Sequence, residues 1–166
     1  MPFELGRLLL AQAQTSEEVI RLWGEAFPFS FVLDGSLTII SSGPLLRKIY
    51  PGVSVRSQLA QCFTSPQFTQ TNVTTLQLRA QAGQLLLLYC ASREALPPLR
   101  GQWLILSGDH LLFLGWPWVT SFGQLAPLGI SLVDIPPHNP LAEILLLLQT
   151  NRSAMDDARD LAMTLK

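Results

Sequence analysis

Few side chains in this chain of 166 residues are of the types that perform chemistry at neutral pH. The chain has two histidines, His110 and His138, and two cysteines, Cys62 and Cys90. A histidine acts as a general base, or binds a metal or haem iron, only where partner groups converge on it. No cluster of Cys, His, Asp and Glu with ligand spacing surrounds either histidine, so we expect no metal and no cofactor.

The motifs that carry catalysis are also missing from the sequence. It contains no G-x-S-x-G, no G-x-x-x-x-G-K-[ST], no G-x-G-x-x-G, no H-E-x-x-H and no C-x-x-C. Nothing therefore supplies a nucleophile with its base, or a preformed cradle for phosphate. The sequence predicts a protein that is not an enzyme and has no catalytic residues.

Each histidine has a structural explanation. His110 follows Gly108-Asp109 between the apolar runs WLILS and LLFLGW, and this spacing predicts a hairpin turn with a solvent-facing histidine. His138 lies in the run PPHNP, where Asn139 is suited to cap a helix and Pro140 to begin it. Asp134, four residues before His138, either accepts a hydrogen bond that fixes the bend into that helix or is simply solvated.

Composition limits the classes of partner. The chain is 48% hydrophobic and only 14% charged, which favours a homodimer or another assembly that covers apolar surface. Its net charge of −1, without a basic run, argues against nucleic-acid binding. No apolar run approaches 18 residues and residues 1–10 lack the pattern of a leader, so we expect no membrane span and a cytoplasmic location with reduced cysteines.

Hydrophobic periodicity predicts an α+β fold built on one antiparallel sheet. A capping box at residues 15–18 predicts a helix over 16–26, with Val19, Leu22, Trp23 and Ala26 on one face. Residues 29–40 predict a hairpin with a two-residue type I′ turn at Asp34-Gly35. Two or three short helices are expected between 42 and 68, and further strands over 73–79, 84–92, 100–107 and 111–116. This gives six strands in total.

The last part of the chain predicts a long helix with an apolar seam. Apolar residues recur at spacings of three and four, and Asn151 is a polar residue within the seam that would fix its register. Such a helix is suited to coiled-coil pairing with a second copy. The seam comprises Leu141, Ile144, Leu145, Leu148, Asn151, Met155, Ala158, Ala162 and Leu165. The aromatic stripe of Phe113, Trp116, Trp118 and Phe122 belongs either to the core or to an interface.

Three ordered segments resemble the haem-NO-binding-associated family, also called the H-NOX-associated family. The first carries Phe27, Pro28, Phe29, the acidic turn at Asp34 and Gly43, with Ser30 where the family commonly has His. The second carries Leu99-Arg100-Gly101-Gln102 and Phe113-Leu114 with Pro117. The third carries Asp134, Ile135, Pro136 and His138, with Asn139 in place of Asp. The resemblance covers residues 25–165.

The resemblance implies a PAS-like fold of five to six strands with short covering helices, an N-terminal helix and a C-terminal coiled-coil-type helix. It implies a dimer placed between an H-NOX gas sensor and an output domain, a histidine kinase or a guanylate cyclase, without catalysis or haem of its own. We expect a lead-in at 1–14, the PAS-like domain at 15–135 and the signalling helix at 136–166. The alternative is a PAS-type sensor with a small ligand in its core, lined by Leu76, Leu86, Leu88 and Phe113.

Overall fold

The computed structural model describes residues 17–68 and 73–164 and divides the chain into two compact units. The first unit ends at Trp118 and the second begins at Val119. Thr15 and Ser16 of the expected capping box, the expected lead-in at 1–14, and Leu165 lie outside the described residues. Helix α2 (Glu17–Ala26) agrees with the helix predicted over 16–26.

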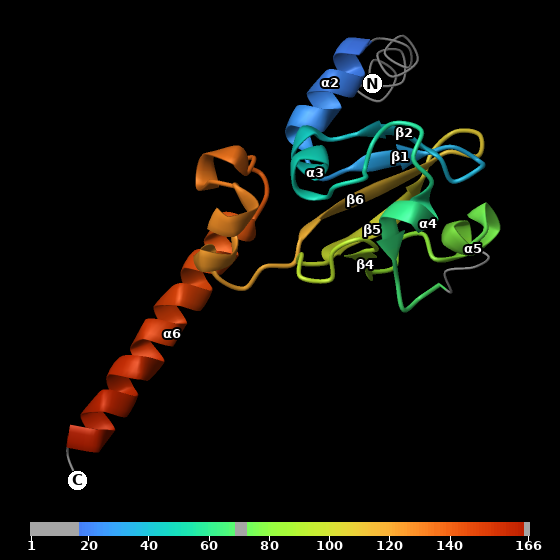
Figure 1. The fold of residues 1–166 in the computed structure, drawn as a ribbon. Coiled ribbons are helices and arrows are strands. Elements are labelled where there is room, and N and C mark those ends of the chain that lie inside the picture. The colour runs from blue at the N-terminus through green and yellow to red at the C-terminus, as the bar shows by residue number, and fades with distance from the viewer. Residues whose placement is uncertain (1–16, 69–72, 165–166) are drawn as a thin grey trace, which may run out of the picture. The chain divides into compact units, whose positions relative to one another are not determined.

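The first unit is built on one antiparallel sheet of six strands in the order β2-β1-β6-β5-β4-β3 (Figure 1). The strands are β1 (Phe31–Leu33), β2 (Ile39–Ser42), β3 (Phe63–Thr64), β4 (Leu86–Cys90), β5 (Leu99–Ile105) and β6 (Leu111–Pro117). Short helices α3 (Pro44–Ile49), α4 (Leu59–Cys62) and α5 (Thr75–Ala80) lie between them. The α+β prediction with six strands is confirmed, and so are short helices within 42–68.

One predicted strand is wrong. Residues 75–80 form helix α5, although Leu76 and Leu78 alternate with polar residues as in a strand. A capping box explains the difference. The backbone N–H of Gln77 donates to the Thr74 hydroxyl oxygen, and the backbone N–H of Thr74 donates to Gln77 Oε1. Helical geometry then buries Leu78 and leaves Leu76 78% exposed. The sixth strand is instead the short β3, which the sequence analysis did not identify.

The hairpin at residues 31–42 is present, but its type I′ turn is wrong. Strand β1 ends at Leu33 and β2 begins at Ile39, so five residues connect them. Gly35 does not have the positive φ that a type I′ turn requires, whereas Leu37 has φ 61°. The Asp34 side chain organises this longer loop through hydrogen bonds to Ser36 and Thr38.

The other hairpin follows the prediction closely. Strands β5 and β6 pair from Leu99 with Pro117 to Ile105 with Leu111. The Leu106 N–H donates to the His110 carbonyl across the turn at 3.1 Å, and Gly108 adopts φ 68°. Because only glycine takes this left-handed conformation without strain, Gly108 lets the chain reverse here. His110 therefore lies in a turn, as expected.

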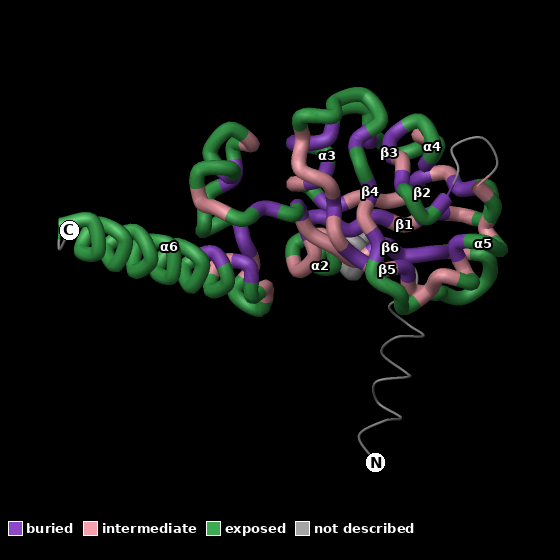
Figure 2. Tube along the Cα trace, turned by 90° about the horizontal axis from the view of Figure 1, so that it is seen from below, coloured by how far each residue is buried: buried purple, intermediate pink, exposed green. Residues whose placement is uncertain are grey.

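Aromatic rings form the centre of the core in the first unit. Phe31 and Phe113 stack with ring centroids 5.1 Å apart, and Trp103 meets Phe113 edge-on at 5.3 Å. Phe63 also stacks on Phe31, with ring centroids 5.6 Å apart. All four side chains are buried, as the tube coloured by burial shows for their strands (Figure 2). Phe113 of the predicted aromatic stripe therefore belongs to the core.

A pair of glycines makes room for the Phe113 ring. Gly101 on β5 is paired with Gly115 on β6. A Cβ atom added to Gly101 would lie 2.7 Å from Phe113 Cζ and 2.2 Å from the Leu114 carbonyl oxygen, and one added to Gly115 would lie 2.6 Å from the same ring. The ring occupies the space that two side chains would otherwise take, so both glycines are required by packing.

We therefore expect Gly101→Ala and Gly115→Ala each to lower the free energy of unfolding by about 2 kcal/mol or more, since backbone and ring must both shift. Gly123→Ala is the matched control, because its Cβ would meet only the Ser121 hydroxyl at 3.9 Å. Urea unfolding followed by tryptophan fluorescence measures all three. Equal stability of the three variants would contradict this account of the core.

Candidate functional site

The second unit consists of three short 3-10 helices followed by the long helix α6 (Leu141–Thr164). The short helices are η1 (Phe122–Gln124), η2 (Ala126–Leu128) and η3 (Leu132–Asp134). The unit buries Leu125, Ile130, Ile135, Leu141 and Leu145. Only the first turns of α6 therefore contribute to a core within this chain.

The start of α6 is fixed by the residues that the sequence indicated. Asn139 Oδ1 accepts the Leu141 N–H at 3.0 Å, as expected of a capping asparagine, and the Ile144 N–H donates to the Pro140 carbonyl at 2.9 Å. Asp134 Oδ2 accepts both the Ser131 N–H and the Ser131 hydroxyl at 2.8 Å. Asp134 therefore holds the loop before the helix, which was one of its two expected roles. His138 is exposed in this loop.

The structure divides the expected seam into a buried and an exposed part. Leu141 and Leu145 are buried, whereas Leu148 is 43% and Met155 74% exposed. The tube coloured by burial shows that most of α6 is exposed (Figure 2). Further exposed members of the seam are Ile144, Asn151, Ala158 and Ala162. Large apolar side chains on a solvent-facing helix are unfavourable unless a partner covers them.

A second apolar row, which the sequence analysis missed, adjoins the seam. Leu147, Ala154 and Leu161 recur every seven residues, and the two leucines are 64% and 65% exposed. At 100° per residue, this row, the row from Ile144 and the row from Leu148 together span about 100° of the helix. The spacing of seven residues is the signal in the sequence that could have identified this row. We call these three rows the apolar face of α6.

Opposite charges border the two sides of the apolar face. Arg152 and Arg159 follow the row of Leu148, while Glu143 and Asp157 follow the row of Leu147. In a parallel pair related by a twofold axis, each side of one helix faces the opposite side of the other. An antiparallel pair would instead place arginine against arginine, so the charges favour parallel pairing with a second copy.

In the first segment that resembles the family, the residues make packing contacts and hydrogen bonds within the first unit. Pro28 and Phe29 are buried, and the Leu46 N–H donates to the Pro28 carbonyl at 3.0 Å. Gly43 fits against this turn, because an added Cβ would lie 2.3 Å from the Pro28 carbonyl oxygen. The hydroxyl of Ser30, which stands where the family commonly has His, donates to the Phe27 carbonyl at 2.7 Å.

The second segment that resembles the family, from Leu99 to Pro117, contributes residues to the core and to the end of the sheet. Gly101 and Phe113 belong to the packing described above, and Pro117 is buried opposite Leu99. Gln102 is half-buried on β5 beside Leu114. In the third segment Pro136 is half-buried. These residues shape the fold and are not gathered into one pocket.

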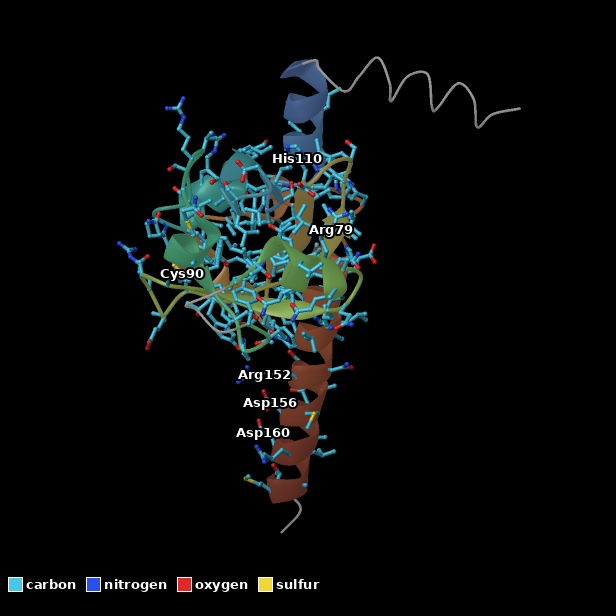
Figure 3. The ribbon with its side chains drawn as sticks, turned by 90° about the vertical axis from the view of Figure 1, so that its right-hand side faces the viewer. Arg79, Cys90, His110, Arg152, Asp156 and Asp160 are labelled. Carbon is cyan, nitrogen blue, oxygen red and sulfur yellow. The ribbon has the colours of Figure 1, made fainter. Side chains whose placement is uncertain are left out.

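His110 lies apart from Cys90, whereas Cys62 and Cys90 are near each other, since Cys62 precedes Phe63 and Phe63 pairs with Cys90 (Figure 3). His110 Nδ1 lies 3.2 Å from the Ser107 carbonyl, at the end of the first unit where Arg79 donates to the Gly108 carbonyl (Figure 3). Cys62 and Cys90 are free, buried thiols, as expected, and burial raises the pKa of the Cys62 thiol. Among residues 17–68 and 73–164, no three His, Cys, Asp or Glu side chains are placed to share a metal ion.

The four residues expected to line a ligand site in the core are not brought together. Leu86, Leu88 and Phe113 are buried, but Leu76 projects from α5 into solvent. Trp103 is fully buried, and its indole N–H has no hydrogen-bond partner among the described residues. Its ring packs edge-on against Phe31 with the planes at 87°. The centre of this core is therefore occupied by aromatic side chains.

Comparison with known protein families gives one match. A sequence model of the family described as Heme NO binding associated matches residues 69–166, which is more than half of the chain. The chain belongs to the Heme NO binding associated family. The match includes the segments around Gly101 and Asp134 and confirms the resemblance, while the segment from Phe27 to Gly43 precedes it.

Membership of the Heme NO binding associated family links the chain to H-NOX signalling proteins, with which such domains are associated. No curated protein matches the sequence. No helix in the described part of this family member is both long and apolar enough to cross a membrane.

The acidic turn of this family member gives a prediction about pH. The Ser36 hydroxyl donates to Asp34 Oδ1 at 2.7 Å, and the Thr38 and Ser36 N–H groups donate at 2.9 Å, so the pKa of Asp34 lies below its ordinary value. A lowered pKa stabilises the fold above the ordinary pKa near 3.8, and this stability is lost as the pH falls through the folded-state value.

We expect Asp34→Asn to be less stable than the wild type at pH 7 by under about 1 kcal/mol, because the carboxylate is largely solvated. The difference should shrink at pH 3, below the ordinary pKa near 3.8, because the unfolded wild-type chain then binds a proton at this carboxyl more readily than the folded chain does. Urea unfolding at both pH values measures it. A difference that grows on acidification would show that Asp34 does not contribute through its charge.

Proposed function

We propose that this chain is a non-catalytic dimerisation and signal-relay module that couples an H-NOX gas sensor to an output domain, a histidine kinase or a nucleotide cyclase. Family membership supports the link to H-NOX proteins. The observation that carries the relay role is the exposed apolar face of α6, which a second copy would cover. In this proposal residues 15–135 are the PAS-like domain, 136–166 the signalling helix and 1–14 a lead-in, in the cytoplasm.

The composition of the apolar face suits a helix pair that can change from one arrangement to another. Its 24-residue helix is about 36 Å long, and the exposed rows span about three heptads. Within them Asn151, Ala154 and Ala158 bury little apolar area, so the pair is held weakly compared with an all-leucine seam. Asn151 would favour a helix pair in register, because a polar side chain in a seam is best satisfied by its own counterpart.

Two arrangements of the helix pair share one row. The row of Ile144, Asn151 and Ala158 can be combined either with the row of Leu148 or with the row of Leu147. Adjacent rows of a heptad repeat differ by about 50° around the helix axis, so a modest rotation exchanges the two arrangements. A sensor that contacts only one arrangement shifts the population between them, and the helix passes this change to the output domain.

Self-association through this face is tested by Leu148→Glu. A charge on each copy within the seam should raise the dissociation constant of the dimer about tenfold or more, as measured by sedimentation velocity over a range of protein concentrations. Leu146→Glu is the control, because Leu146 is 60% exposed on the opposite side of α6. A Leu148→Glu variant that dimerises as well as the Leu146→Glu variant would contradict the proposal.

A further inference from the structure

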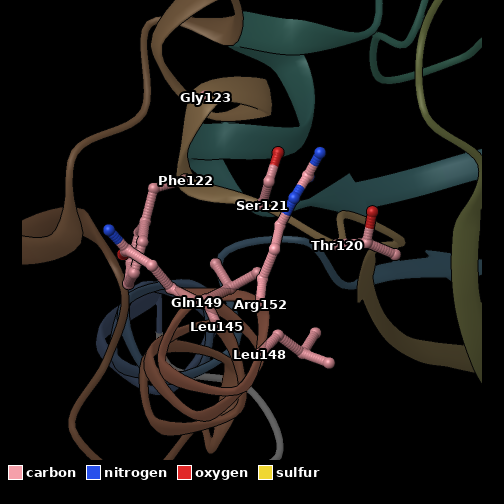
Figure 4. A pocket seen from close by; sticks show the side chains of 8 residues that line it. All are labelled: Thr120, Ser121, Phe122, Gly123, Leu145, Leu148, Gln149 and Arg152. Carbon is pink, nitrogen blue, oxygen red and sulfur yellow. The ribbon is translucent and has the colours of Figure 1, made fainter. Parts of the chain in front are cut away.

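A small pocket lies within the second unit, between α6 and residues 120–123, which include the start of η1. It has a volume of about 220 Å³. Its floor is one side of α6, with Leu145, Leu148, Gln149 and Arg152 at successive turns. Its wall consists of Thr120, Ser121, Phe122 and Gly123 (Figure 4). The pocket is complete within one copy of the chain.

The polar lining of the pocket consists of hydrogen-bond donors with no acid beside them. Arg152 extends from α6 towards Ser121, with Phe122 and Gln149 at one side (Figure 4). No Asp or Glu lines the pocket. Among the described residues, the side chains of Arg152, Gln149 and Ser121 form no hydrogen bond or ion pair. Within one copy of the chain, their donors are therefore available to a ligand.

The wall of the pocket is fixed before any ligand binds. The Thr120 N–H donates to Gln124 Oε1 at 2.7 Å, and the Ser121 carbonyl accepts the Gln124 N–H at 3.2 Å. On the floor, Leu145 is buried, so the helix at this point is held by packing. A preformed wall reduces the entropy lost on binding.

The neighbouring charges do not neutralise Arg152. Asp156 and Asp160 follow it along one side of α6 at four-residue intervals (Figure 3). Neither lines the pocket, and an acid placed C-terminal to a base at this spacing is the weaker orientation for a helical ion pair. Arg152 is thus a cation beside an apolar surface, with its planar group suited to a carboxylate.

We propose that this pocket binds a small organic carboxylate with an apolar body. The guanidinium of Arg152 holds the carboxylate, assisted by the Gln149 amide and the Ser121 hydroxyl. Phe122, Leu145 and Leu148 cover the apolar part. The pocket volume, about seven water volumes, suits a ligand of roughly the size of a benzoate ion. Bound ligand would tie the first turns of α6 to the segment at residues 120–123.

Benzoate is the probe, titrated into the isotopically labelled protein and followed by the backbone amide resonances. We expect saturable shifts at residues 120–123 and 145–152. Benzamide keeps the shape without the charge, and acetate keeps the charge without the ring, so both should bind about tenfold more weakly or worse. Equal binding of benzamide, or no saturable shift with benzoate, overturns the proposal.

Arg152→Gln should weaken benzoate binding about tenfold or more, since it removes a charged hydrogen-bond donor. Arg159→Gln is the matched control, one heptad further along α6 and outside the pocket. Equal loss in both variants would indicate only a general charge effect and overturn the site. Titrations at two protein concentrations distinguish benzoate binding from dimerisation. Benzoate binding that disappears as the dimer forms also overturns the proposed site. Failure of the chain to dimerise leaves the proposed site intact.

Discussion

The contact of the Phe113 ring with the Gly101 and Gly115 backbones is the constraint on which the first unit depends. With no Cβ on either glycine, the Phe113 ring has room beside the paired strands β5 and β6. From there it stacks on Phe31 of β1 and meets the edge of Trp103. One packing arrangement thus joins the three neighbouring strands β1, β6 and β5.

The second unit lacks such a self-contained core. Its buried residues hold the 3-10 helices and the start of α6, and beyond Leu145 the helix presents apolar rows to solvent. Three rows of exposed apolar side chains cost free energy in an isolated helix, and a second copy is the simplest way to cover them. The first unit therefore has its own aromatic core, while the second carries exposed apolar rows that a second copy would cover.

Much of the fold could be predicted from local signals. Gly108 and the apolar runs beside it specify the β5–β6 hairpin, and Asn139 with Pro140 specifies the start of α6. The segment at 75–80 was misjudged because two leucines two residues apart follow the strand period, whereas the capping box of Thr74 and Gln77 begins a helix. The hairpin at Asp34 was misjudged because the dipeptide indicates a turn but not its length.

The candidate site was only partly visible in the sequence. Periodicity identified the seam. It could not show that Leu141 and Leu145 are buried within the chain while Leu148 and Met155 are exposed. That distinction depends on the irregular segment at 119–135, whose path no periodic pattern describes. The pocket at Arg152 was invisible for the same reason, since its wall and floor lie more than twenty residues apart in the chain.

Parallel pairing of α6 with a second copy is the central claim, and distances between spin labels test it most directly. Labels at Ser153 and, separately, at Asp160 lie one heptad apart on the side of α6 opposite the apolar face. In a parallel pair in register, double electron–electron resonance should give nearly equal intermolecular distances at the two positions. Markedly different distances would indicate an antiparallel pair, and the absence of any intermolecular distance would indicate no pair; either result would contradict the account.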